Sequence, residues 1–287
     1  MPVPSLSFEF FPPKSLPASF RLWDCVQTLA PLDPAFVSVT YGAGGTTRKL
    51  THEAVEAITK TTDLPVAAHL TCVDATRAQT LEIAKTYKAA GVSHIVALRG
   101  DPPEGTVGFQ PNPDGFAGSI ELTRALADRG FDVTVGAYPE THPDASSPQA
   151  CIDHLKAKID AGASRAITQF FFEAETFLRF RDACANSGIS APIVPGVLPV
   201  ENWSGVQKFA KSCGAHIPPL LRDAFDKADG TESADLMATA HATELCDILC
   251  DEGVDHLHFY TLNKPELTRD VCHALGISPK LSLQNVA

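Results

Sequence analysis

The 287-residue sequence lacks long apolar runs and has no excess of positive charge. No uninterrupted apolar stretch approaches the ~20 residues that a membrane-spanning helix needs. Lys and Arg total 23 against 34 Asp and Glu, a net charge of −11. An acidic surface repels nucleic-acid phosphates and anionic lipids. The first residues place no basic region before a hydrophobic one, unlike a signal peptide. We therefore expect a cytoplasmic protein with no nucleic-acid or membrane partner.

Metal-binding and disulfide motifs are also scarce. The eight cysteines include no Cys-x-x-Cys pair, and Cys246 and Cys250 are one helical turn apart in an apolar pattern. In a cytoplasmic protein this spacing favours reduced, buried thiols. His256 and His258 could form a metal pair on one strand face, but no carboxylate cluster completes such a site. We predict no metal and assign both histidines to packing or hydrogen bonding.

No Gly/Ser linker or low-complexity tract divides the chain, so we expect one domain over residues 1–287. Short β-rich runs alternate with amphipathic helical segments, as in parallel sheets covered by helices. The predicted strands are residues 5–11, 36–41, 66–71, 94–99, 132–138, 166–171, 193–197 and 257–261. Eight strand–helix units favour an α/β fold of the (β/α)8 TIM-barrel type over a doubly wound sheet. Roughly sixty residues separate the last two strands, which predicts extra helices inserted before the eighth.

Polar side chains recur at the C-terminal ends of these strands, while the strand bodies stay apolar. Active sites of (β/α)8 barrels lie at this end. This distribution therefore favours an enzyme over a structural protein. The residues concerned are Glu9, Thr40, Tyr41, His69, Thr71, Arg99, Asp101, Tyr138, His142, Gln169, Tyr260 and Lys264.

Glu9 is the strongest catalytic candidate because its sequence neighbours Phe8, Phe10 and Phe11 are apolar. Desolvation raises a carboxyl pKa, which suits a proton donor near neutral pH. A solvated or ion-paired glutamate is the alternative.

The sequence allows two interpretations for each of two loops. Asp101 follows Arg99 and Gly100, which suits an anionic or carbonyl-rich ligand, or else a turn with a local Arg–Asp pair. The glycine-rich loop at residues 42–47 is either a phosphate cradle or a plain turn. It lacks the dinucleotide fingerprint because Thr47 occupies the position of the third glycine.

Taken together, the motifs resemble the methylenetetrahydrofolate reductase family, in its bacterial form that consists of the catalytic domain alone. They occur in family order and cover nearly the whole chain. The matching segments are Phe8-Glu9-Phe10-Phe11-Pro12-Pro13, Val37-Ser38-Val39-Thr40-Tyr41-Gly42-Ala43, His69-Leu70-Thr71-Cys72, Leu98-Arg99-Gly100-Asp101, Tyr138-Pro139-Glu140, Ile167-Thr168-Gln169-Phe170-Phe171 and His258-Phe259-Tyr260-Thr261-Leu262-Asn263.

The resemblance implies a barrel that holds FAD at the strand ends. NADH or NADPH would pass a hydride to the flavin and leave, and 5,10-methylenetetrahydrofolate would then take the hydride to become 5-methyltetrahydrofolate, feeding methionine synthesis. Bacterial relatives favour NADH, and relatives form homo-oligomers.

The resemblance also implies residue roles. Glu9 would protonate folate N10 as the ring opens to an iminium ion, and the charge of Asp101 would stabilise that ion. Thr40 would contact the nicotinamide. Further substrate-binding positions are Gln169, Phe209, Tyr260 and Lys264. The implied FAD-binding positions are Tyr41, Ala43, His69, Arg99, Gly100, Asp101, Ala117, Tyr138, His142, His154 and Lys158.

Three positions depart from the family pattern. Cys151 replaces an aspartate at the adenosine end of FAD, Gly205 replaces a folate-contacting glutamine of some relatives, and Lys264 replaces an arginine. Lysine keeps the charge but loses the forked donor. We expect no C-terminal regulatory domain, since the chain ends at Ala287 just after its barrel.

Other functions stay open at this point: a flavin-independent reductase, a non-catalytic flavin- or folate-binding barrel, and another flavin barrel such as a proline-oxidising enzyme. The flavin-site residues disfavour the first of these. The retention of Glu9 disfavours the second, and the Gln169 and 260–263 matches disfavour the third.

Overall fold

Parallel β-strands form a barrel in the computed structural model, which describes residues 3–41, 47–101 and 109–279. Most of the strand residues are apolar and buried, as expected for strands covered by helices. The strands are β1 (Ser5–Phe10), β2 (Phe36–Val39), β3 (Val66–Thr71), β4 (His94–Leu98), β5 (Asp132–Ala137), β6 (Arg165–Thr168), β7 (Ile193–Val194), β8 (Gly196–Val197) and β9 (His256–Tyr260).

The order of the strands nearly closes the barrel. The sheet runs β7-β6-β5-β4-β3-β2-β1-β9-β8, and every strand pair is parallel. Its two end strands, β7 and β8, are separated in the chain only by Pro195. The predicted strand at residues 193–197 is therefore two short strands, of which β7 pairs with β6 and β8 pairs with β9. Between these two end strands, Pro195 O accepts a hydrogen bond from His258 N of β9 at 3.0 Å. The α/β barrel prediction is confirmed.

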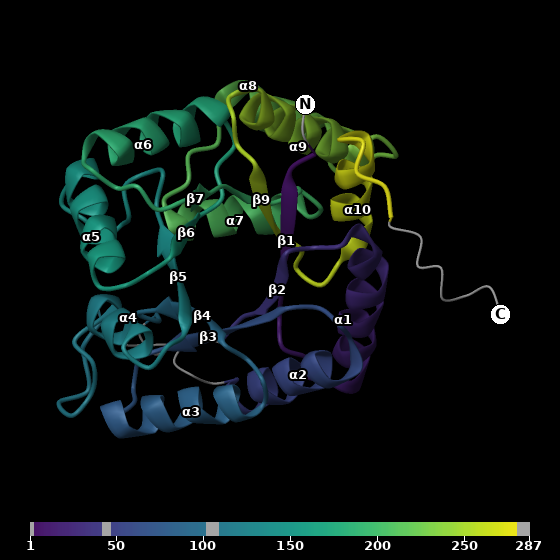
Figure 1. The fold of residues 1–287 in the computed structure, drawn as a ribbon. Coiled ribbons are helices and arrows are strands. Elements are labelled where there is room, and N and C mark those ends of the chain that lie inside the picture. The colour runs from purple at the N-terminus through teal and green to yellow at the C-terminus, as the bar shows by residue number, and fades with distance from the viewer. Residues whose placement is uncertain (1–2, 42–46, 102–108, 280–287) are drawn as a thin grey trace.

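Helices surround the strands on the outside of the barrel (Figure 1). The main hydrophobic core lies between the two layers; it includes Phe8, Phe10 and Phe259 from the strands and Leu22 and Leu249 from the helices. The helices are α1 (Leu16–Leu29), η1 (Ala30–Leu32), α2 (Arg48–Thr61), α3 (Arg77–Ala89), α4 (Ser119–Ala127), α5 (Pro148–Asp160), α6 (Ala174–Asn186), α7 (Trp203–Cys213), α8 (Pro219–Ala228), α9 (Ala234–Asp251) and α10 (Pro265–Ala274).

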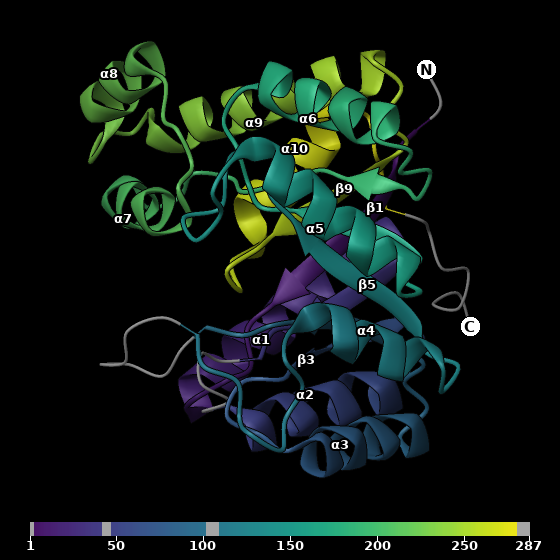
Figure 2. The same cartoon turned by 90° about the vertical axis from the view of Figure 1, so that its left-hand side faces the viewer.

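Three of these helices, α7, α8 and α9, lie between β8 and β9, so the predicted insertion is confirmed. Figure 2 shows α7 and α8 beyond one end of the barrel, while α9 joins the outer layer beside α6 and α10. A second apolar cluster holds the insertion in place. In it, Trp203 of α7 stacks on Phe225 of α8 at 5.0 Å, and Phe170 and Phe172 contribute from the segment after β6.

No helix in the described part of the chain is long and apolar enough to cross a membrane.

Candidate active site

Strand β1 presents two different faces. Leu6, Phe8 and Phe10 belong to the core under the helices. Because side chains alternate along a strand, Ser7 and Glu9 point to the other face, into the barrel. Glu9 lies near the C-terminal end of β1, with its side chain 14% exposed.

Two histidines from other strands flank the Glu9 carboxyl. Its Oε2 lies 3.4 Å from His69 Nε2 of β3 and 3.8 Å from His258 Nε2 of β9. Burial lowers the pKa of His69 to about 4 and of His258 to about 3, so both rings are neutral near pH 7. Burial also raises the pKa of Glu9, and His69 partly offsets this effect. Glu9 is therefore a carboxyl suited to hold a proton.

The cause of this raised pKa differs from the sequence argument. Phe8 and Phe10 pack beneath the helices, on the side of β1 opposite Glu9, and Phe11 is 40% exposed. The histidines beside the Glu9 carboxyl come from β3 and β9, strands that are distant from β1 in the sequence but near it in the barrel.

Tyr260 is the residue opposite Glu9 in the β1–β9 register. Its hydroxyl donates to Thr168 O of β6 at 2.6 Å, so the hydroxyl proton of Tyr260 is already engaged in a hydrogen bond within the protein. The ring fits because Gly196 lies against it: a Cβ there would be 2.5 Å from Tyr260 Cε2 and 2.2 Å from Thr168 O. Sequence reasoning missed Gly196, since nothing in the local sequence indicates these contacts.

Basic side chains gather beside β4, β5 and α5. Lys158 is buried, and its Nζ donates to Gly136 O at 2.5 Å. Burial lowers the pKa of Lys158 to about 8. Desolvation, followed by the charges of Lys158 and Arg99, lowers the pKa of His154 to about 4, and the pKa of His142 is lowered as well. The ring of His142 also contacts Tyr138 edge to face at 4.5 Å. Two cationic side chains, Lys158 and Arg99, thus lie near two histidines in a protein whose net charge is −11.

Arg99 makes its ion pair with Asp144, at 3.0 Å, rather than with the nearby Asp101. Asp101 is exposed. Burial raises the pKa of Tyr138 to about 12, and the negative charge of Asp101 adds to this rise. Asp101 and Tyr138 are therefore electrostatic neighbours at the strand ends.

Backbone geometry shapes the remaining predicted cofactor positions. Gly100 has φ +86° and a Cβ there would be 2.6 Å from Val73 Cγ1, so only glycine fits. Thr40 O accepts from Thr51 Oγ1 at 2.9 Å. Tyr41 is buried, and Ala117 N donates to Glu121 Oε2 at 3.1 Å. The predicted position Ala43, with its glycine-rich loop, lies outside the described residues.

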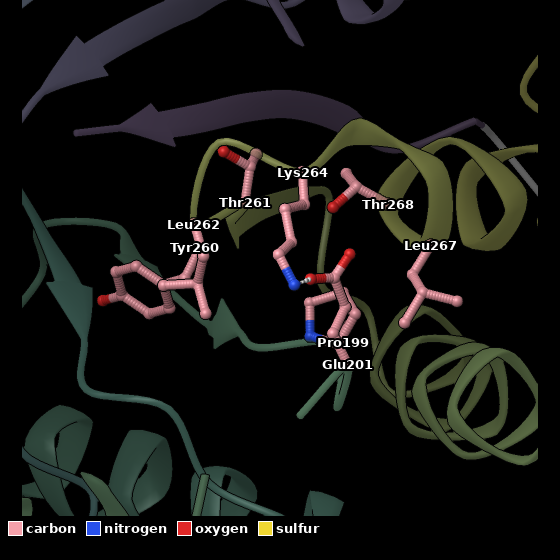
Figure 3. Close-up of a pocket in the computed structure, with 8 residues that line it drawn as sticks. All are labelled: Pro199, Glu201, Tyr260, Thr261, Leu262, Lys264, Leu267 and Thr268. Atoms are coloured by element: carbon pink, nitrogen blue, oxygen red, sulfur yellow. Dashed lines mark ion pairs between the residues drawn. The ribbon is translucent and has the colours of Figure 1, made fainter. Parts of the chain in front are cut away.

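The predicted folate-binding residues occupy the same end of the barrel. Gln169 Oε1 accepts from Phe170 N at 3.0 Å. Phe209 of α7 is 42% exposed, with its ring 5.2 Å from that of Phe170. Lys264 makes an ion pair with Glu201 at 2.8 Å, and Figure 3 shows the two side chains pointing toward each other. Glu201 was not predicted from the sequence.

The other two departures from the family pattern, Cys151 and Gly205, also have local partners. Cys151 Sγ accepts a hydrogen bond from His142 N at 3.4 Å. Gly205 is exposed in the first turn of α7, and its N–H donates to the N-cap residue Asn202 at 3.0 Å.

Comparison with known proteins assigns the family. A family model for methylenetetrahydrofolate reductase matches residues 3–276. The chain belongs to this family. It is 46% identical over 281 residues to the 5,10-methylenetetrahydrofolate reductase of Pectobacterium carotovorum subsp. carotovorum, covering 97% of this chain and 92% of that protein. To the Escherichia coli (strain K12) reductase it is 45% identical over 279 residues, covering 96% and 92%.

The methylenetetrahydrofolate reductase family also includes longer proteins. Methylenetetrahydrofolate reductase (NADH) 1 of Arabidopsis thaliana is 34% identical, and the match covers 95% of this chain but 48% of the plant protein. Among solved structures, a Clostridium thermocellum protein that binds two copies of 5-methyl-5,6,7,8-tetrahydrofolic acid aligns with a TM-score of 0.60 and 14% identity, covering 96% and 95% of the two chains. At this identity the likeness concerns the fold alone.

Proposed function

We propose that the chain carries out the family's reduction of 5,10-methylenetetrahydrofolate to 5-methyltetrahydrofolate with bound FAD and with NADH or NADPH as the electron donor. The observation that carries this proposal is Glu9. It is a buried carboxyl with a raised pKa, placed between neutral imidazoles at the catalytic end of the barrel.

The residues present fit FAD. Arg99, His142, His154 and Lys158 form a cluster of basic side chains. Burial lowers the pKa values of His142, His154 and Lys158, and the charges of Arg99 and Lys158 add to this effect at the two histidines; an anionic diphosphate would offset both effects. Gly100 lets the backbone after β4 pack closely against Val73, where a Cβ would not fit. When bound, FAD would supply the hydride chemistry, by accepting a hydride from the nicotinamide and giving it to the folate methylene carbon. This two-stage exchange is a ping-pong order.

Glu9 supplies the acid step. Its proton goes to N10 of the folate as the bond between the methylene carbon and N10 breaks, and the electron pair of that bond stays on N10. The methylene carbon, now an iminium on N5, can accept the hydride and become a methyl group. The carboxylate of Asp101, at the same end of the barrel, would stabilise the iminium charge.

The cofactor assignment is tested by spectroscopy. The purified protein, given excess FAD and then desalted, should keep flavin absorbance, and anaerobic NADH or NADPH should bleach it before folate is added. A protein that retains no flavin is not a flavoenzyme. Hydride transfer to folate without such bleaching would instead indicate direct transfer from the nicotinamide.

The role of Glu9 is tested by Glu9→Gln, which keeps the shape of the side chain and removes its acidity. Flavin reduction by NADH should stay near the wild-type rate, since it requires no N10 protonation. Reduction of methylenetetrahydrofolate should fall by about 10²-fold or more, the usual contribution of a general acid. The exposed substitution Glu82→Gln is the control. Normal folate turnover in Glu9→Gln would remove Glu9 from the mechanism.

A further inference from the structure

Glu9 lies next to the end of its strand, where a backbone needs extra support. Phe10 is the last residue of β1, and in the ladder with β9 the pairing ends at Glu9 and Tyr260. Pro12 and Pro13 soon follow, and neither has a backbone N–H to donate to a neighbouring strand. A catalytic group must be held to within about 0.5 Å of its productive position. Groups outside the ladder are therefore needed to fix the backbone after Glu9.

Thr261, the first residue after β9, holds the carbonyl group of Glu9. Its hydroxyl donates to Glu9 O at 2.7 Å, and its backbone N–H donates to the same oxygen at 3.3 Å. The side chain is in turn fixed from two sides: Asn263 N donates to Thr261 Oγ1 at 3.2 Å, and Cys25 Sγ of α1 donates to it at 3.7 Å. Thr261 is only 3% exposed. The peptide group after Glu9 is thus anchored by a buried hydroxyl.

Asn263 holds the residue that follows β1. Its Oδ1 accepts from Phe11 N at 2.8 Å, and its Nδ2 donates to Phe11 O at 2.9 Å. An amide side chain offers one acceptor group and one donor group, as the backbone of a paired strand does. Asn263 therefore extends the pairing between β1 and the β9 segment to Phe11, although the backbone of that segment has already turned away.

The turn that brings Asn263 to Phe11 is conformationally unfavourable. Leu262 and Asn263 both have positive φ angles, +50° and +56°. Asparagine tolerates this region, whereas a bulky residue such as leucine rarely adopts it. Figure 3 shows Leu262 beside Thr261 where the chain leaves the strand. Strain of this kind persists only where surrounding contacts fix the conformation, and it is concentrated at functional sites.

We propose that Thr261 and Asn263 are positioning residues that fix the backbone after Glu9 and so hold its carboxyl within reach of folate N10; this inference rests on the proposed function. Both act on the peptide groups of residues 9–11 and not on the reacting atoms. Loss of either anchor lets the end of β1 move, and a displacement of about 1 Å can slow a reaction about 10²-fold. Flavin reduction by NADH needs no proton from Glu9 and should be spared.

A matched pair of variants tests Thr261. Thr261→Val keeps the shape of the side chain and removes the hydroxyl, whereas Thr261→Ser keeps the hydroxyl and removes the methyl group. Each FAD-loaded variant is reduced anaerobically with NADH and then mixed with saturating methylenetetrahydrofolate. We expect flavin reoxidation to be about tenfold slower in Thr261→Val and near the wild-type rate in Thr261→Ser. If Thr261 served only for packing, Thr261→Ser would be the slower of the two.

Asn263→Gly tests the second anchor, because glycine removes the amide and still accepts a positive φ. Asp74→Gly is the matched control: Asp74 is exposed in the loop after β3 and also has a positive φ, +52°. We expect Asn263→Gly to slow reoxidation by saturating folate about tenfold and to leave flavin reduction by NADH unchanged. Asp74→Gly should change neither rate.

A double variant shows whether the effect passes through Glu9. Glu9→Gln has no acidic proton to position, so adding Thr261→Val should not slow its residual reoxidation by folate any further. A further loss of about tenfold, equal to the loss that Thr261→Val causes alone, would mean that Thr261 acts independently of Glu9.

Three other results would overturn the proposal. Equal slowing of flavin reduction and reoxidation would indicate a general structural defect, and a loss that disappears at saturating folate would indicate a role in binding. Normal reoxidation in both Thr261→Val and Asn263→Gly would mean that Glu9 needs neither anchor. Failure of the proposed function looks different. In that case the wild-type flavin is not reoxidised by the folate at all, or Glu9→Gln is fully active.

Discussion

At the scale of single residues, Lys158 carries the clearest prediction for the cofactor. Its buried ammonium group donates to Gly136 O, and burial lowers its pKa to about 8, so the folded protein holds this charge at a cost. An anionic ligand nearby would offset that cost. Lys158→Met should therefore weaken FAD binding about tenfold or more, as expected for the loss of one charge-assisted hydrogen bond.

Lys156→Met is the control for this measurement. Lys156 lies on the same helix, is 42% exposed and pairs with Asp160. Titration of the apoprotein with FAD, followed by flavin fluorescence, compares the variants. Equal FAD affinities for Lys156→Met and Lys158→Met would show that Lys158 is not part of a diphosphate site.

The neighbours of Glu9 show how far sequence reasoning reaches at this scale. Because side chains alternate along a strand, the sequence alone was enough to place Ser7 and Glu9 on the same face of β1. It contained no signal for the distances from Glu9 to His69 and His258, because these depend on how β1, β3 and β9 are arranged around the barrel. Glu201 was missed for the same reason, since its partner Lys264 lies beyond the inserted helices.

At the scale of elements, the two-residue strand β8 depends on Gly196. A Cβ at this position would lie 2.2 Å from Thr168 O, a backbone atom that cannot move aside easily. Gly196→Ala should therefore lower the free energy of unfolding by about 1–3 kcal/mol, the usual cost of overpacking. It should also displace Tyr260 and reduce activity.

Gly118→Ala is the matched control, because a Cβ there meets nothing within 4 Å. Urea unfolding followed by circular dichroism gives the free energies of both variants. If Gly196→Ala unfolds at the same urea concentration as Gly118→Ala, the close packing of β6, β8 and β9 has been misjudged.

The order of the elements was readable in the sequence, because each apolar run and each helical pattern is local. The helices inserted before the last strand were also predicted from the length of that connection. The division of residues 193–197 into β7 and β8 was not. It arises because the first half pairs with β6 and the second with β9, a choice made by strands that are distant in the sequence. The contact of Phe209 with Phe170 likewise depends on where the insertion packs.

At the scale of the whole molecule, the barrel interior makes the protein sensitive to acid. Burial lowers the pKa to about 4 for His69, His94 and His256, and to about 3 for His258. Unfolded histidines titrate near 6.5, so between these values the unfolded chain binds more protons. The free energy of unfolding should therefore fall as the pH decreases from about 6.5 toward 4.

Urea unfolding at a series of pH values measures how the free energy of unfolding changes with pH, and His256→Gln should make that dependence weaker. Glu9 acts in the opposite direction: its pKa is raised in the folded state, so its contribution to stability declines as the pH rises above its ordinary value of 4.5. The free energy of unfolding of Glu9→Gln, relative to that of the wild type, should therefore increase as the pH rises above 4.5. A flat profile between pH 4 and 6.5 would mean that the interior histidines are hydrated in solution.

The position of β9 has a consequence for how the protein is made. This strand lies between β1 and β8, and it brings His258 to Ser7, 251 residues earlier in the chain. A ribosome that has released only the residues before β9 has produced a barrel with a gap, and the gap falls where His258 and Tyr260 belong. The surroundings of Glu9 are therefore completed in the last step of closure, so a nascent or partly unfolded chain can hold most of its helices and strands and still lack an active site.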